Sequence, residues 1–182
     1  MPADPFPLLR DAWLSEFRKQ KAYIDGAVAQ LSDEQFRARP APNLNSAAVI
    51  VKHLAGNLMS RWTDWLTTDG EKPDRNRDDE FIDKGEPREV LMQRHEAGWR
   101  LVFDALAAMT AADLTRTVTI RSEPHSVPLA ISRSLAHCAY HAGQVMLIAR
   151  SIAGNENWKW QTVPPGGTIA FNAAMRAKHQ SK

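Results

Sequence analysis

The chain has 182 residues, of which 43% are hydrophobic and 24% are charged, which is typical of a globular protein that buries a core. Its 23 Lys and Arg residues nearly balance its 21 Asp and Glu residues, so the formal net charge is +2. This balance excludes the strongly basic surface of an electrostatic nucleic-acid binder, and we expect no nucleic-acid partner. The single cysteine, Cys138, cannot form a disulfide within the chain, so nothing points to an oxidising compartment.

The sequence shows no sign of export or of membrane insertion. The N-terminal segment MPADPFPLLR lacks the charged and apolar regions of a secretory signal, and no stretch is long and apolar enough to cross a bilayer. We therefore expect a cytoplasmic protein without a membrane partner. Its length favours a single domain over residues 1–182.

Apolar residues recur at helical spacing near the start of the chain. From about Leu8 to Leu31 they form one stripe with charged side chains on the other faces, which predicts a first long helix. Ser32 and Gln35 match a capping box, which predicts a short helical turn directly afterwards. The segment PAPNLN at 40–45 then interrupts the helical pattern.

A second long helix is expected to begin near Ser46 or its predecessor Asn45 and to carry apolar residues as far as Trp65. The polar stretch from Thr67 to Pro87, rich in Gly and Pro, predicts a long loop, and such loops in compact domains are often functional. This loop could be a lid that supplies an acid or a base, although a charged run is more often solvated surface. Its charged residues include Arg75, Arg77, Asp78, Asp79 and Glu80.

The pattern then predicts a third long helix, which begins at Pro87 and whose apolar arc extends to Met109. The β-branched run TRTVTIRSEPHSV at 115–127 predicts a short β-hairpin. A fourth long helix is expected from about Pro128 to Ala153, where Gly154 is a typical C-terminal signal.

The C-terminal tail contains Trp158 and Trp160, so we expect it to pack across the helices. Taken together, the elements predict an all-α fold. It is a four-helix bundle with a small β-hairpin between helices three and four and an extended C-terminal tail.

Three histidines form the pattern most typical of a chemical site. His53 lies in the second predicted helix, and His137 and His141 lie four residues apart in the fourth. Side chains at i and i+4 share a helix face, so two imidazoles from one helix and one from its neighbour can converge on a divalent metal ion and leave coordination positions open. Neutral imidazoles suit Zn(II), Ni(II) or Fe(II). The alternative is that these histidines are hydrogen-bonded core residues, and spacing alone does not separate the two interpretations.

Small and polar residues share the helix faces of these histidines. They include Ser46, Gly56, Asn57, Ser60, Ala130, Ser134 and Gln144. Because close-packed cores prefer large aliphatic residues, this composition indicates a cavity between the helices. Asn57 and Gln144, one turn from the histidines, could orient a bound water or substrate, or could simply satisfy internal hydrogen bonds.

Three other residues, Cys138, His95 and Gln20, are further candidates for the site. The run HCAYH is not the HExxH motif of metalloproteases, because no Glu follows His137. Cys138 is rotated by about 100° from His137 on a helix, so we expect a small core residue there and not a ligand. His95 could be a fourth ligand or could support the ligands, but a core histidine fits its apolar arc better. Gln20 could line the cavity, although an ordinary buried or flanking amide is the simpler interpretation.

Several strings of the sequence together resemble a known family. They are VIVKHLAGNL and RWTDWLTTDGEK near the second helix, RNRDDEF in the loop, SLAHCAYHAGQVMLIAR in the fourth helix and PPGGTIAFN in the tail. The combination, which extends from about Asn45 to Asn172, is similar to the DinB/YfiT-like metalloenzyme family, and specifically to a bacterial subfamily of unknown function. The resemblance implies a four-helix bundle, often dimeric, whose metal ligands are one histidine of the second helix and a His-x-x-x-His pair of the fourth. Those ligands correspond here to His53, His137 and His141.

The resemblance also implies a function. Members of that family include transferases and isomerases that use a low-molecular-weight thiol, and hydrolases also occur. The first expectation is therefore a metal-dependent, thiol-dependent S-transferase that acts on a small-molecule substrate, with a divalent metal ion as cofactor and no catalytic residue assigned. A homodimer is expected from the family alone. The alternatives are a metal-dependent hydrolase and a non-catalytic helical bundle for ligand binding or stress response.

Overall fold

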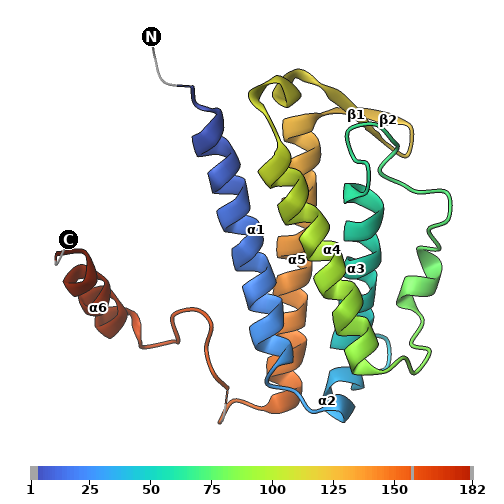
Figure 1. The fold of residues 1–182 in the computed structure, drawn as a ribbon. Coiled ribbons are helices and arrows are strands. Elements are labelled where there is room, and N and C mark those ends of the chain that lie inside the picture. The colour runs from blue at the N-terminus through green and yellow to red at the C-terminus, as the bar shows by residue number, and fades with distance from the viewer. Residues whose placement is uncertain (1–3, 157, 181–182) are drawn as a thin grey trace.

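The computed structural model describes residues 4–156 and 158–180. Its long helices in the bundle are α1 (Phe6–Val28), α3 (Ala47–Trp62), α4 (Arg88–Ala108) and α5 (Val127–Ala153) (Figure 1). Helix α3 packs against α4 and α5, and α1 packs against α5 and α4. The predicted four-helix bundle is confirmed. Trp65, expected within the second helix, instead lies in the turn that follows α3.

Shorter helices occur in the connections. They are α2 (Asp33–Arg37), η1 (Asp78–Phe81) and η2 (Ala111–Thr115). The capping box predicted before α2 is present, because the backbone N–H of Gln35 donates to Oγ of Ser32 at 3.1 Å and the N–H of Ser32 donates to Oε1 of Gln35 at 3.0 Å. The short helix η1 lies within the long loop between α3 and α4.

The predicted hairpin between α4 and α5 is confirmed as the antiparallel strands β1 (Thr117–Ile120) and β2 (Glu123–Ser126). Its two turn residues, Arg121 and Ser122, have φ values of 56° and 64°. Positive φ at both residues gives a two-residue turn the same twist as the strands that it joins. The side chain of Asp69 accepts hydrogen bonds from the backbone N–H groups of both turn residues, at 2.8 and 2.7 Å. This contact attaches the hairpin to the loop that follows α3.

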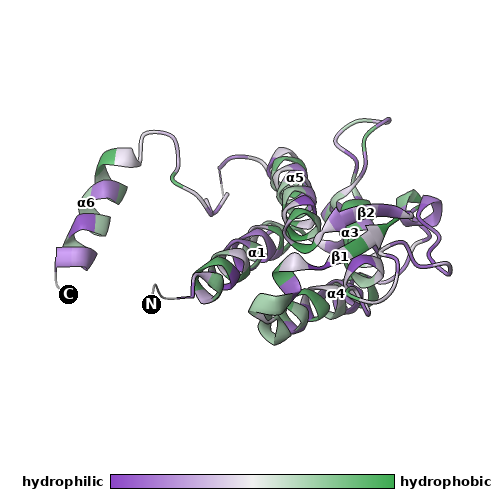
Figure 2. Cartoon of the chain, turned by 90° about the horizontal axis from the view of Figure 1, so that it is seen from above, coloured by the Kyte–Doolittle hydropathy of each residue, from purple (hydrophilic) through white to green (hydrophobic). Residues whose placement is uncertain are grey.

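The core lies between the four long helices and is built around aromatic rings. Phe17 of α1 meets Trp62 of α3 and Trp99 of α4 edge to face, with ring centroids 5.7 and 6.3 Å apart. Helix α5 contributes Ile131 and Val145, which are completely buried. Figure 2, in which the bundle is seen from above, shows these four helices grouped around the core.

The C-terminal tail packs on the bundle only where it begins. Trp158 is buried, and the backbone N–H and C=O of Lys159 both bond the side-chain amide of Gln30 at the end of α1, at 2.7 and 3.1 Å. The tail then forms an additional helix, α6 (Thr168–Gln180), which has no buried residue and lies apart from the bundle (Figures 1 and 2). The expectation that the whole tail packs across the helices is therefore wrong beyond its first residues. None of the described helices combines the length and the apolarity that a bilayer-spanning segment needs.

Candidate metal centre

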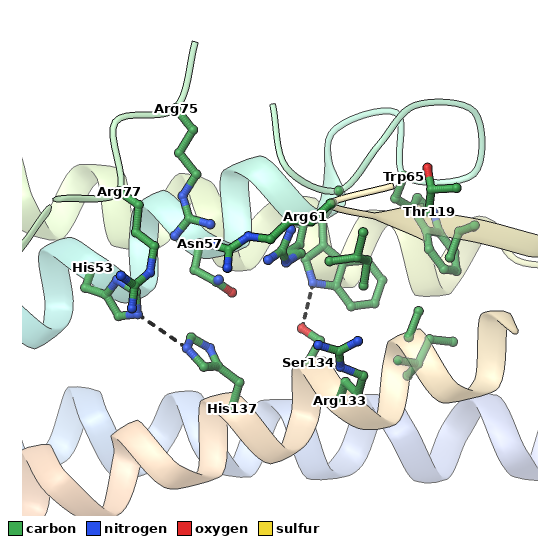
Figure 3. A pocket seen from close by; sticks show the side chains of 17 residues that line it. His53, Asn57, Arg61, Trp65, Arg75, Arg77, Thr119, Arg133, Ser134 and His137 are labelled. Atoms are coloured by element: carbon green, nitrogen blue, oxygen red, sulfur yellow. Dashed lines mark hydrogen bonds between the residues drawn. The ribbon is translucent and has the colours of Figure 1, made fainter. Parts of the chain in front are cut away.

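The structure brings the three predicted histidines together between α3 and α5. Nε2 of His137 lies 3.3 Å from Nε2 of His53 and 3.1 Å from Nε2 of His141. The potential ligand atoms of all three side chains lie within 4.8 Å of one another. Two imidazole nitrogens that bind one tetrahedral ion, each about 2.1 Å from it, lie roughly 3.4 Å apart. The spacing is therefore that of a cluster that could hold a metal ion, and Figure 3 shows the rings of His53 and His137 facing each other.

Local sequence sets the helices that carry these rings. The hydroxyl of Ser46 accepts from the N–H of Val49 at 3.2 Å and starts α3, and Ser126 caps α5 in the same way. Helix α5 ends at Gly154, whose φ of 83° favours glycine. Because both helices bury the faces that bear the histidines, the rings point into the bundle and not toward solvent.

In His53 and His141, Nδ1 faces a hydrogen-bond acceptor, and this acceptor determines which ring nitrogen carries the proton. Nδ1 of His53 donates to Oε2 of Glu80 at 2.8 Å, and Nδ1 of His141 donates to Oε1 of Gln144 at 2.8 Å. Because a carboxylate and an amide oxygen only accept hydrogen bonds, the proton of each neutral ring lies on Nδ1 and the lone pair lies on Nε2. Both lone pairs therefore face His137. Gln144 thus makes an internal hydrogen bond, which was the alternative interpretation of this residue, and it makes that bond to His141.

The cluster favours neutral imidazoles. Burial lowers the pKa of His137 to about 3, and the adjacent His141 and His53 lower this pKa further. Burial, followed by the effect of His53, lowers the pKa of His141 to about 4. Neutral imidazole is the form that binds metals. Lone pairs of neutral rings at these distances repel one another unless a shared hydrogen or a cation lies between them, so the donor set fits a divalent ion.

Glu80 and Arg75, which the sequence predicts only as members of a charged loop, are parts of the site. Glu80 of η1 is 7% exposed and receives a two-point contact from Arg75, with Nε to Oε1 at 2.8 Å and Nη2 to Oε2 at 2.9 Å. Burial alone would raise the pKa of Glu80, but hydrogen bonds from His53 and Arg75 hold this pKa below its usual value. Glu80 is therefore a carboxylate that orients His53, as partners of metal-binding histidines commonly do. Asp78, by contrast, is exposed, as the alternative interpretation of the charged run expected.

Small residues of α3 make room for this loop. A Cβ atom on Gly56 would lie 2.3 Å from Oε1 of Glu80, so only glycine allows the carboxylate to reach His53 without a shift. The hydroxyl of Ser60 donates to the carbonyl of Gly70 at 2.8 Å and accepts from the N–H of Lys72 at 3.0 Å. Gly56 and Ser60 were expected to line a cavity, but they instead receive the loop. A glycine three residues after His53 was the signal in the sequence for this contact.

The predicted cavity is present beside the histidines, with a volume of about 200 Å³. It lies between α3, α5, the hairpin and the loop after α3, and Asn57, Ala130 and Ser134 line it, as the sequence predicted. The indole N–H of Trp62 donates to the hydroxyl of Ser134 at 3.0 Å. Figure 3 shows the histidines at one end of the cavity and Trp65 with Thr119 at the other.

The remaining candidates lie outside the cluster. Nε2 of His95 lies 3.1 Å from a carboxylate oxygen of Asp25 and accepts the indole N–H of Trp99 at 3.1 Å, so His95 is a core histidine near α1. Cys138 is completely buried, and burial raises the pKa of its thiol to about 12, which leaves it unreactive. Gln20 is half-buried and is not among the described residues that line the cavity.

Together, the fold and the site define a helical bundle with a buried three-histidine cluster that could hold a metal ion. The sequence profile of a family described as "Protein of unknown function (DUF1572)" matches residues 9–167. Because this match covers most of the chain, including the three histidines, the protein belongs to the DUF1572 family. No curated protein matches the chain.

Proposed function

We propose that the protein is a metal-dependent enzyme in which His53, His137 and His141 bind a divalent ion such as Zn(II), Ni(II) or Fe(II). The observation that carries this proposal is the convergence of three ring nitrogens, at 3.1 and 3.3 Å, beside a cavity. A site with three protein ligands leaves coordination positions open, as catalytic metal sites do. The resemblance of the chain to DinB/YfiT-like metalloenzymes supports the same ligand set.

The side chains around the cluster have distinct roles in this proposal. His53, His137 and His141 would hold the ion, which would lower the pKa of a water or thiol ligand and so supply a nucleophile near neutral pH. Glu80 and Gln144 keep the protons of two rings on Nδ1, so that Nε2 remains a ligand. The amide of Asn57 and the hydroxyl of Ser134 line the cavity and can orient a substrate.

Thiol transfer is the reaction that we favour. The one cysteine of the chain, Cys138, is buried and has a pKa raised to about 12, so the chain supplies no reactive thiol of its own. In a thiol transferase the nucleophile comes from a low-molecular-weight co-substrate, which agrees with the thiol-dependent enzymes in the family that the sequence resembles. A cavity of about 200 Å³ suits such a small co-substrate and not a macromolecule.

Elemental analysis of protein purified without a histidine tag tests the ligand set. We expect about one divalent ion per chain in the wild type and a large loss in the His53→Ala and His137→Ala variants. The matched control is His179→Ala, because His179 is exposed on α6. The same metal content in all four proteins would contradict the proposed ligands.

A panel of thiols crossed with simple electrophiles tests the reaction. We expect a thioether product with at least one thiol, and we expect the rate to fall in the His137→Ala variant. Activity on esters or amides, with no product from any thiol, would identify a hydrolase. Binding of these compounds without turnover would identify a non-catalytic bundle.

A further inference from the structure

Positive charge is concentrated around the cavity beside the histidines. Arginines from α3, the loop after it, the hairpin turn and α5 line this cavity, namely Arg61, Arg75, Arg77, Arg121 and Arg133. Among the described residues that line it, none is an aspartate or a glutamate. A small cavity with several guanidinium groups and no acid in its wall favours an anionic ligand.

The acids behind the cavity wall do not balance this charge. One carboxylate oxygen, Oε2 of Glu71, lies 3.1 Å from Arg61, 3.1 Å from Arg75 and 3.4 Å from Arg121. Glu80 is already bound to Arg75 and His53. The exposed Glu123 and Asp78 lie at the longer ion-pair distances of 3.6 Å from Arg133 and 3.9 Å from Arg77. Five guanidinium groups and four carboxylates leave an excess of positive charge, and a metal ion at the histidines would add to it.

Arg61 in particular has an unused hydrogen-bond donor. Its side chain is 16% exposed, and its buried Nη1 makes no hydrogen bond, although Glu71 is within ion-pair distance. Burial lowers the pKa of Arg61, and repulsion from Arg75, Arg121 and Arg133 lowers this pKa further. A bound oxyanion would relieve this repulsion and accept the unused N–H.

The wall of the cavity also has an apolar part. Trp62, Trp65, Val118, Ile120 and Ile131 contribute to its wall. In Figure 3, Arg61 and Arg133 lie between the histidines at one end and Trp65 at the other. Along the cavity in Figure 3, the imidazoles of His53 and His137 are therefore followed by the guanidinium groups of Arg61 and Arg133 and then by the indole of Trp65.

We propose, on the basis of the function proposed above, that the substrate is a small molecule with an oxyanion group, a carboxylate or a phosphate, joined to an apolar group. Arg61, Arg121 and Arg133 bind the oxyanion. The apolar group lies against Trp65, and the reacting atom of the substrate lies beside His53 and His137.

Calorimetric titration with four probes tests this assignment: phenylacetate, phenyl phosphate, the neutral analogue phenylacetamide, and acetate. We expect at least one aromatic anion to bind about 10-fold or more tightly than phenylacetamide, and to bind less tightly as salt increases. The tighter of phenylacetate and phenyl phosphate identifies the oxyanion. Acetate is expected to bind more weakly than phenylacetate, because it lacks the apolar group. Equal binding of the neutral probe and both aromatic anions would overturn the proposal.

Two exposed arginines allow substitution with little risk to the fold. Arg121 and Arg133 have side chains that are 58% and 49% exposed, and each Gln variant is expected to weaken anion binding by about 10-fold. Arg100→Gln is the matched control, since Arg100 is exposed on α4 and does not line the cavity. Unchanged anion affinity in both Arg121→Gln and Arg133→Gln, with unchanged melting temperatures, would contradict the assignment.

Two further measurements separate the parts of the proposal. In Trp65→Ala, phenylacetate is expected to lose affinity while acetate does not, and equal losses would place the apolar group elsewhere. In His137→Ala, anion binding is expected to persist without bound metal, because the arginines remain. A wild type that binds the aromatic anion but no metal would therefore overturn the proposed function and leave the anion site intact.

Discussion

Oε2 of Glu80 lies 2.8 Å from Nδ1 of His53, and this contact joins the long loop between α3 and α4 to the three-histidine cluster. Glu80 is held from its other side by Arg75, whose side chain is 5% exposed. The part of the loop that carries Arg75 and Glu80 therefore belongs to the site, whereas Asp78 of the same loop is exposed. A buried carboxylate behind a histidine raises the basicity of the ring and fixes its orientation.

Removing the charge of Glu80 should weaken metal binding without abolishing it. In Glu80→Gln the amide can still contact His53, but the ring loses its anionic partner, and we expect metal affinity to fall by about 10- to 100-fold. Competition with a chromophoric chelator measures this change. Glu89→Gln, at an exposed position of α4, is the control, and equal affinities in the two variants would show that Glu80 has no such role.

Substitution of Gly56 by alanine should lower metal affinity, whereas the same substitution elsewhere in a helix should change only stability. In Gly56→Ala the new methyl group meets the carboxylate of Glu80 at 2.3 Å and should displace it from His53, so metal affinity should fall. Gly143→Ala on α5 is the control, because no atom lies within 4 Å of its new Cβ, and we expect it to raise stability by about 0.5 to 1 kcal/mol with unchanged metal affinity. Melting curves and chelator competition on both variants distinguish these outcomes. Undiminished metal affinity in Gly56→Ala would contradict the contact.

His95 should contribute to stability and not to metal binding. His95→Leu leaves the buried indole N–H of Trp99 without its acceptor, so we expect a loss of about 1 to 3 kcal/mol in the free energy of unfolding. The metal content should equal that of the wild type. A lower metal content in a folded His95→Leu variant would restore the fourth-ligand interpretation.

Asp69 should make stability depend on pH in the acid range. Its carboxylate accepts from the N–H groups of Glu71, Arg121 and Ser122 at 2.7, 2.8 and 2.7 Å, and despite its partial burial these bonds lower its pKa from 3.8 to about 2. Because the pKa is lower in the folded state, the stabilisation is complete above pH 3.8 and is lost as the pH falls through about 2.

Urea denaturation of Asp69→Ala measures this contribution. At pH 6 we expect the variant to unfold with a free energy about 1 to 2 kcal/mol below that of the wild type. The difference between the two unfolding free energies should shrink as the pH is lowered toward 2, because the carboxyl of Asp69 in the wild type then becomes protonated and loses its charge. A difference that stays constant between pH 6 and pH 2 would show that the charge of Asp69 is not involved.

The features that could be predicted from the sequence are those set by local spacing. The apolar stripes predicted the long helices, and the i, i+4 spacing of His137 and His141 placed both rings on one face. Glu80 and Arg75 could be predicted only as members of a charged loop, because their positions depend on how η1 packs on α3. Gly56 was the local sign of that packing, since a glycine inside a helix costs stability unless another group needs its space.

Two other features depended on tertiary arrangement. The arginines of the cavity come from segments as far apart as Arg61 and Arg133, so no single stretch of sequence shows them as a group. Helix α6 was not predicted because Trp158 suggested a tail packed along its whole length. The structure shows that this packing ends near Gln161, whose side chain lies against Gly26 of α1, and that a helix without a buried face follows.

Titration of Zn(II) into metal-free protein, compared directly with the double variant His137→Ala/His141→Ala, tests the central claim. The proposed site predicts saturation at about one ion per chain in the wild type and loss of that binding in the variant, with both proteins folded. The same stoichiometry and affinity in both proteins would contradict the three-histidine metal centre.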